Sequence, residues 1–119
     1  MVFAPGDPRQ AFLLTCKAFD LAERYQVPCI IMTDQYLADS EWTYGEFEFD
    51  CVSYADHRLR GDPLSEAAGY KRYAFTSGGV SPLAVPGASR HLVVADSDEH
   101  DEEGHIVEDA LTRTRMVEK

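Results

Sequence analysis

Carboxylate and imidazole side chains crowd one ten-residue stretch of the chain, residues 96–105. This acidic segment contains six Asp or Glu residues and two histidines, side chains that can bind metals or exchange protons. Like charges a few ångströms apart repel each other even in water, so this many carboxylates are costly to hold on a folded surface. Three interpretations follow: a solvated tail, a metal site, or a segment shaped by contact with a partner.

The spacing of possible ligands disfavours a specific metal site. His100 and His105 are five residues apart, whereas the paired zinc ligands of a helix are four apart with a catalytic Glu between them. The segment also lacks the alternating Asp/Asn positions and the closing Glu of a calcium loop. We therefore predict no metal ligand here, and keep weak binding of a divalent cation as an alternative.

Nucleophilic catalysis and phosphate binding have no motif in this chain. Ser81, Ser97 and Cys51 are not embedded in the pattern of a nucleophile elbow. Ser77–Gly79 lacks the Lys-Ser/Thr that follows the glycines of a phosphate-binding loop, and predicts a tight turn instead. We therefore predict no catalytic and no cofactor-binding residue within these 119 positions.

The composition sets further limits on function. The chain has 11 Lys and Arg against 21 Asp and Glu, a net charge of −10, which argues against binding nucleic acid or an anionic membrane. No apolar run approaches the roughly 20 residues that a membrane span needs. Three cysteines without a CxxC pair favour a cytoplasmic location, with Cys16 and Cys29 as buried structural thiols.

A strand–helix–strand unit is predicted at the start of the chain. Asp7, Pro8 and Gln10 form a capping box before a helix whose wide apolar stripe suits the cover of a sheet. Apolar runs at 2–4 and 29–32 flank this helix, and the second predicts a parallel strand buried on both faces. We therefore expect a βαβ unit with a right-handed crossover.

Thr33, Asp34 and Gln35 follow the second predicted strand, at the edge where open α/β sheets bind their ligands. Short polar side chains at such positions also hydrogen-bond the backbone of turns and helix starts. For Asp34 we therefore favour a cap or turn role, and keep a ligand role as the alternative.

The rest of the chain, residues 41–119, is predicted to be less regular. Aromatic and acidic residues alternate over 46–50, which indicates a half-exposed strand or an extended arm that wraps a neighbour. Short strands are predicted at 70–75 and 92–95. A helix is predicted at 106–119, where charge changes from acidic to basic along its length and complements the helix dipole.

Essentially the entire chain resembles the alpha subunits of 2-oxoacid:ferredoxin oxidoreductases, especially the 2-oxoglutarate type. In that family an Ala-Phe-x-Leu-Ala-Glu-x-Tyr helix precedes a Pro-containing strand and an Asp-Gln-Tyr-Leu-Ala-Asp-Ser stretch. The matching positions in the first half are Ala18, Phe19, Leu21, Ala22, Glu23, Tyr25, Pro28 and 34–40. Those in the second half are 70–73, 79–82, 86–87, 96–105, Glu108, Asp109, Arg113 and 116–119.

The resemblance implies an enzyme that oxidatively decarboxylates a 2-oxoacid, joins the acyl group to coenzyme A and reduces ferredoxin. Thiamine diphosphate with Mg²⁺ would form the carbanion, and Fe–S clusters on partner polypeptides or domains would take the electrons. A beta subunit would contribute the diphosphate-binding domain with its Gly-Asp-Gly motif.

The chain departs from the family by starting late. The family's Tyr-Pro-Ile-Thr-Pro element, cofactor-contacting glutamate and substrate-binding arginine lie upstream of the matched region, so no catalytic residue carries over. We expect an α/β fold with a partial βαβ parallel-sheet unit, the end of a pyrimidine-binding domain, at 1–40. An extended arm, an acidic loop and a C-terminal helix are expected at 41–119. The isolated chain should be inactive and should self-associate through exposed sheet edges and faces.

The resemblance favours the third interpretation of the acidic segment. We expect Asp98, Glu99, His100 and His105 to form a polar interface network where the subunit meets its partners, with a solvated acidic turn as the alternative. The alternative for the whole chain is a stand-alone α/β module that docks a basic partner or a divalent cation.

Overall fold

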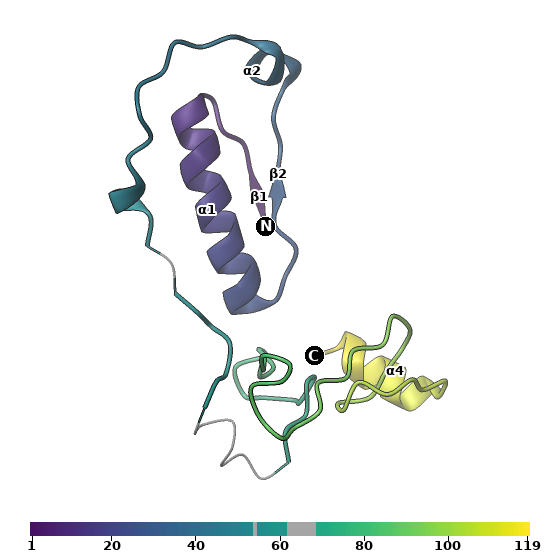
Figure 1. Ribbon diagram of the computed structural model, residues 1–119. Coiled ribbons are helices and arrows are strands. Elements are labelled where there is room, and N and C mark those ends of the chain that lie inside the picture. The colour runs from purple at the N-terminus through teal and green to yellow at the C-terminus, as the bar shows by residue number, and fades with distance from the viewer. Residues whose placement is uncertain (54, 62–68) are drawn as a thin grey trace. The chain divides into compact units, whose positions relative to one another are not determined.

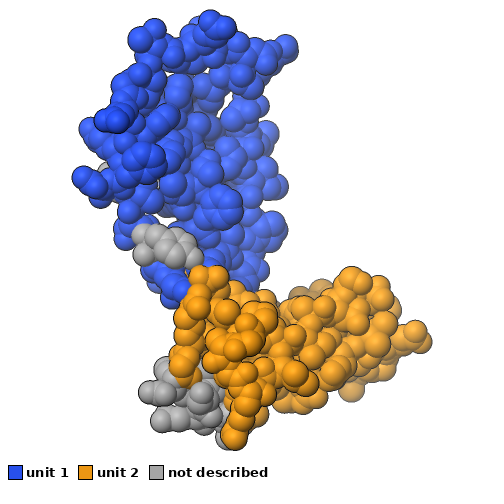
Figure 2. Space-filling model, viewed as in Figure 1, with its two compact units in different colours: residues 1–56 blue, residues 57–119 orange. Residues whose placement is uncertain are grey.

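The computed structural model describes residues 1–53, 55–61 and 69–119 (Figure 1). It contains two compact units, residues 1–56 and 57–119, shown in blue and orange in Figure 2. In sequence order the regular elements are β1 (Val2–Phe3), α1 (Pro8–Tyr25), β2 (Ile30–Ile31), α2 (Gln35–Asp39), the 3₁₀ turn Phe49–Cys51 and α4 (Ala110–Val117).

Helix α1 begins at the predicted capping residues. Oδ1 of Asp7 accepts a hydrogen bond from Gln10 N at 2.8 Å, and Oε1 of Gln10 accepts one from Gly6 N at 3.0 Å. Pro8 occupies the first helical position, where its missing N–H costs nothing. The helix ends at Tyr25, and the next residue, Gln26, caps it in the left-handed conformation with φ 53°. The capping box is confirmed, although its second bond reaches Gly6 rather than the backbone of the cap itself.

The two strands form a parallel ladder, with Val2 opposite Ile30 and Phe3 opposite Ile31. Met32 N donates to Phe3 O at 2.8 Å, which extends the ladder by one bond. Helix α1 connects the strands and lies beside them (Figure 1). The predicted α/β class, with one βαβ unit, is therefore confirmed.

The prediction that the second strand is buried on both faces is wrong. Ile30 and Met32 are 54% and 59% exposed, because within the described residues only α1 covers the sheet. Ala18 is the one fully buried residue of α1. Cys16 and Cys29, expected to be buried, are only half-buried. An apolar run therefore indicates that a strand is suited to burial on both faces. Within the described residues, helix α1 covers one face of this sheet, and the other face stays exposed.

Residues 41–48 form the extended arm, not the half-exposed strand. They adopt no regular secondary structure before the 3₁₀ turn begins at Phe49. The ring of Phe12 on α1 packs against the rings of Phe47 and Phe49, at centroid distances of 5.0 and 5.3 Å. The alternating aromatic residues thus attach the arm to the helix.

The second unit is held together by turns and isolated bridges. Residues 70–75 and 92–95 form no strand, so those two predictions are wrong. Tyr73 N donates instead to Glu102 O at 2.8 Å, a bond to a turn rather than to a neighbouring strand. Ser81 and Ala84, 5% and 2% exposed, mark the small interior of this unit.

Helix α4 begins at Ala110 and not at residue 106 as predicted. Oδ1 of Asp109 caps it by accepting a hydrogen bond from Thr112 N at 2.8 Å. The residues just before the cap are held in a different pairing, since Val107 N donates to Glu99 O at 2.8 Å. Among the helices in the described parts of the chain, none combines the length and the hydrophobicity of a membrane span.

Candidate functional site

The acidic segment folds into a hairpin, residues 99–107, which we call the acidic hairpin. His100 and Ile106 form an antiparallel bridge, and Asp101 N donates to His105 O at 2.9 Å. Gly104 N closes the turn by donating to Asp101 O at 3.1 Å. The highest density of negative charge in the chain therefore lies in ordered backbone and not in a loose tail.

The side chain of Asp101 organises the turn. Its Oδ1 accepts hydrogen bonds from Glu103 N at 2.9 Å and from His105 N at 3.0 Å. These backbone donors, above all His105 N, stabilise the charged carboxylate and lower the pKa of Asp101. A carboxylate used in this way is a structural group of the hairpin.

Glu102 attaches the hairpin to residues 71–75. Its Oε1 accepts a hydrogen bond from Phe75 N at 3.0 Å, and Lys71 Nζ lies 3.7 Å from Glu102 Oε2 and 3.5 Å from Glu103 Oε1. The bond from Phe75 N is the largest cause of a lowered pKa for Glu102, with the charge of Lys71 as a smaller one. Backbone N–H groups and one lysine thus hold three of the six carboxylates, Asp101, Glu102 and Glu103.

His100 is held by stacking and by one hydrogen bond. Its ring lies on the ring of Tyr73, with centroids 3.8 Å apart and an interplanar angle of 27°. Nδ1 lies 3.0 Å from Asp101 O, and because a carbonyl only accepts, this nitrogen carries the hydrogen. The guanidinium of Arg72 also lies over Tyr73, 4.7 Å from the ring centroid.

Of the four residues predicted as an interface network, Glu99 and His100 have partners outside the set. Glu99 pairs with Arg113 Nε at 2.5 Å, which links the hairpin to α4 and raises the pKa of Arg113. His105 and Asp98 are exposed. Within the described residues, no hydrogen bond or ion pair joins any two side chains of the set Asp98, Glu99, His100 and His105. In the same parts of the chain, no three His, Cys, Asp or Glu side chains converge as metal ligands.

Sequence reasoning missed a cationic contact at the end of α4. Nζ of Lys119 donates to Tyr73 O at 2.7 Å and also to Ser81 Oγ. Partial burial, and then the nearby charge of Arg72, lower the pKa of Lys119. Lys119 and Arg115 both lie over the ring of Phe75, at 5.5 and 5.0 Å from its centroid. Arg115 lies on α4 and Lys119 follows just after its end, so their spacing of four residues within the helix predicted at 106–119 was the available signal.

In the first unit, a groove of about 620 Å³ lies beyond the carboxyl end of β2. Thr33 lines it, whereas Asp34 caps α2 by accepting a hydrogen bond from Leu37 N at 2.7 Å, which confirms the cap role. The rest of the groove is lined mostly by apolar residues of α1, α2 and the arm: Pro8, Ala11, Phe12, Thr15, Leu37, Ala38, Ser40, Trp42, Tyr44 and Phe47.

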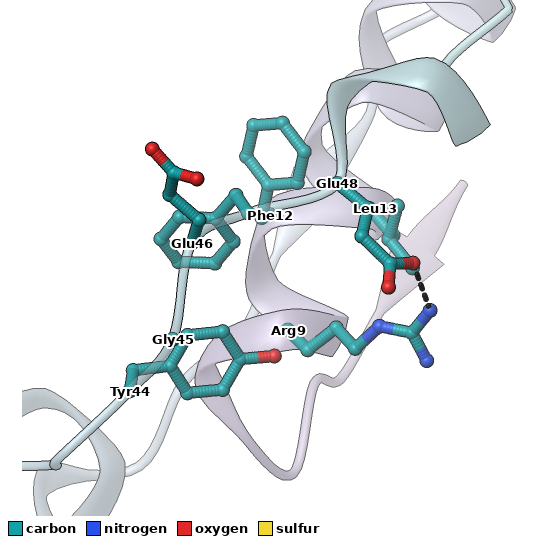
Figure 3. Close-up of a pocket in the computed structure, with 8 residues that line it drawn as sticks. Arg9, Phe12, Leu13, Tyr44, Gly45, Glu46 and Glu48 are labelled. Atoms are coloured by element: carbon teal, nitrogen blue, oxygen red, sulfur yellow. Dashed lines mark hydrogen bonds and ion pairs between the residues drawn. The ribbon is translucent and has the colours of Figure 1, made fainter.

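A neighbouring pocket of about 280 Å³ lies between α1 and the arm (Figure 3). Arg9 Nη2 pairs with Glu48 Oε2 at its edge, 3.2 Å apart, and both side chains are more than half exposed. Tyr44 and Glu46 line the same pocket. Neither hollow brings together the nucleophile, base and orienting group that nucleophilic catalysis by side chains requires.

The whole chain, residues 1–119, matches the family model described as "Pyruvate flavodoxin/ferredoxin oxidoreductase, thiamine diP-bdg". It is also similar to proteins named 2-oxoacid:ferredoxin oxidoreductase subunit alpha. The relative from Sulfurisphaera tokodaii is 40% identical over 123 residues, one from Aeropyrum pernix 36% over 121, and that from Saccharolobus solfataricus 34% over 122. Each alignment covers 100% of this chain but 18% of the relative, so the chain spans less than a fifth of their length.

Gly104 provides a test of how the hairpin packs. Its φ is +91°, and a Cβ added there would collide with Val94 O. Gly104→Ala is therefore expected to lower the free energy of unfolding by about 2–4 kcal/mol, from backbone strain and overpacking together. Gly87→Ala is the control, because Gly87 has φ +78° with nothing within 4 Å of the added atom. Equal losses of stability for the two variants in urea denaturation would contradict this prediction, because they would show that the collision with Val94 O adds nothing to the loss.

The hydrogen-bonded carboxylates predict a pH dependence of stability. The pKa values of Asp101 and Glu102 are lower in the folded chain, so their contribution is present at neutral pH and is lost as they become protonated. The free energy of unfolding should therefore decrease as pH falls from about 5 to about 3, the range where free carboxyls begin to bind protons.

Urea denaturation at several pH values measures this slope. Asp101→Asn removes one of the titrating groups and should give a shallower dependence than the wild-type chain. Glu118→Gln is the control, because Glu118 is an exposed acid outside the hairpin and its loss should leave the slope unchanged. A wild-type slope retained in Asp101→Asn would contradict the role of Asp101.

Proposed function

Because this chain belongs to the thiamine-diphosphate-binding family of pyruvate flavodoxin/ferredoxin oxidoreductases, we propose that it is part of the alpha subunit of a 2-oxoacid:ferredoxin oxidoreductase. The match of all 119 residues to the family model carries this proposal. The reaction would be oxidative decarboxylation of a 2-oxoacid to an acyl-coenzyme A, with reduction of ferredoxin.

We propose 2-oxoglutarate as the substrate, because the sequence motifs resemble that type. Initial rates of the complete complex with 2-oxoglutarate and with pyruvate test this choice, and 2-oxoglutarate should react faster.

We propose a structural and interface role for this segment within the enzyme. Several of its carboxylates cap helices, hold turns or pair with basic side chains, among them Asp101, Asp109 and Glu99. Within the described residues, no three His, Cys, Asp or Glu side chains form a metal-ligand cluster. The described residues therefore do not fit the needs of Mg²⁺ or of an Fe–S cluster, and we derive no catalytic step through them. Thiamine diphosphate, Mg²⁺ and the Fe–S clusters would be held by other parts of the complex, with a beta subunit and ferredoxin as partners.

The proposal divides the segment into the end of a pyrimidine-binding domain, residues 1–40, and an arm, acidic hairpin and C-terminal helix, residues 41–119. A cytoplasmic location belongs to the same proposal and is supported by the free thiols of Cys16 and Cys29. The alternative of a stand-alone cation-binding or docking module has less support, because the hydrogen bonds of Asp101 and Glu102 already engage carboxylates that it would need.

A segment exchange tests the proposed role. Residues 1–119 would replace the matching segment of the Sulfurisphaera tokodaii alpha subunit. Since the segment is proposed to supply structure and not catalysis, turnover of the assembled chimera should stay within about tenfold of the host, a cost below about 1.4 kcal/mol. Its preference among 2-oxoacids should remain that of the host. Ferredoxin reduction and the size of the complex are measured together.

The equivalent segment from Aeropyrum pernix serves as the control for grafting. Two outcomes would contradict the proposal. In the first, the control chimera assembles but the chimera with this chain does not. In the second, the chimera with this chain assembles fully but is inactive. In the active chimera, His100→Ala with His105→Ala should weaken assembly if the acidic hairpin is an interface. Unchanged assembly and turnover would leave the hairpin as a solvated turn.

We also propose that the isolated chain self-associates. Val2, Ile30 and Met32 of the two-stranded sheet are each more than half exposed, and both strands have an unpaired edge within the described residues. Light scattering at micromolar concentration should therefore report species larger than a monomer. Ile30→Lys places a charge on this surface and should shift the chain towards the monomer.

Leu92→Lys is the matched control for this experiment. Leu92 is 84% exposed but lies in the other unit, so the same change of charge there should leave self-association unaltered. A monomeric wild-type chain at tens of micromolar would contradict the proposal, as would equal effects of the two lysine substitutions.

A further inference from the structure

Residues 25–57 have an unusual charge pattern. They contain no Lys or Arg and seven carboxylates, whereas residues 1–24 contain three basic residues. Within this stretch, we call residues 36–50 the acidic–aromatic arm, because aromatic side chains are interspersed among its acids. Such one-sided charge repels nucleic acid and anionic lipid, and attracts basic groups.

The arm exposes more aromatic surface than a solvated loop requires. Tyr36, Trp42, Tyr44 and Phe49 are 76%, 46%, 41% and 69% exposed. Single exposed apolar residues are common, but several large rings gathered on one short segment are typical of binding surfaces. Tyr and Trp are also the residues most enriched among the energetic centres of protein interfaces.

The arm is nevertheless held in place by helix α1. Phe47 packs on Phe12 with ring centroids 5.0 Å apart, and Tyr44 stacks on Phe47 at 4.9 Å. Glu48 pairs with Arg9 on the same helix. A partner would therefore meet a preformed surface, which reduces the entropy cost of docking.

Within the acidic–aromatic arm, the backbone of residues 41–47 is open for pairing. Residues 41–47 form no hydrogen bond, backbone or side-chain, within the parts of the chain that the structure describes. Extended backbone with open N–H and C=O groups is the surface to which another extended segment can add. In the same described parts, the carboxylates of Asp39, Glu41, Glu46 and Asp50 have neither a hydrogen bond nor an ion pair. Burying them against a partner would require opposite charges from that partner.

We propose that the acidic–aromatic arm docks an extended, arginine-bearing polypeptide segment of a partner protein. Arginine fits both features of the surface, because its guanidinium pairs with carboxylates through two hydrogen bonds and also stacks on aromatic faces. Backbone pairing along residues 41–47 supplies the orientation. The inference goes beyond the proposed function, since it depends on neither substrate nor cofactor.

Trp42 makes the proposal directly measurable. It is the single tryptophan of the chain, so its fluorescence reports on the arm alone. The probe is a synthetic eight-residue peptide of alternating Arg and Val, titrated into the full 119-residue chain. Docking should change the emission of Trp42 in a saturable way, and added salt should weaken it. A peptide of alternating Glu and Val should cause no change, and no saturable change with the Arg peptide would overturn the proposal.

Two double variants separate local contacts from net charge. Glu41→Gln with Glu46→Gln should weaken binding about tenfold, since each exposed ion pair accounts for up to about fivefold. Glu108→Gln with Glu118→Gln removes the same charge from exposed positions of the other unit and should leave the affinity within about twofold. Equal weakening by both pairs would reduce the effect to non-specific attraction and overturn the proposal. Circular dichroism of each variant would check that it is folded.

Discussion

Hydrogen bonds from backbone N–H groups to carboxylates allow the acidic hairpin to fold. Two like charges at 4 Å repel by about 1 kcal/mol even in water. Six acids in ten residues therefore oppose a compact turn unless hydrogen-bond donors or cations stabilise their negative charge. Asp101 and Glu102 together accept hydrogen bonds from three backbone amides, and Lys71 lies beside Glu102 and Glu103. The contacts of the second unit follow from this, because Tyr73, the stacked His100 and the Glu99–Arg113 pair are all attached to that turn.

Local signals in the sequence predicted local structure well. The cap of α1, the proline at its first turn and the cap at Asp34 each depend on neighbouring residues, and each is observed. The parallel pairing of β1 with β2 followed from the order of elements. The family resemblance, carried by long ordered motifs, is confirmed by the match over the whole chain, while the 2-oxoglutarate type stays a proposal.

Features that depend on distant contacts could not be predicted in the same way. Residues 70–75 have the composition of a strand, yet Tyr73 and Phe75 donate to Glu102, far along the chain. Helix α4 begins late because Val107 pairs with Glu99. In the candidate site, the density of acids indicated where to look, but which acids hold the turn and which remain exposed is decided by the backbone N–H groups they meet.

The parallel pairing of β1 and β2 has a consequence for how the chain is synthesised. Phe3 O accepts its hydrogen bond from Met32 N, and the whole of α1 lies between them. A ribosome adds roughly 5–20 residues per second, so the first strand emerges and waits for a second or more before its partner exists. During that interval α1, which needs only local bonds, can form first and shorten the distance that the two strands must close. Early formation of α1 would thus bring β1 and the emerging β2 close together before they pair.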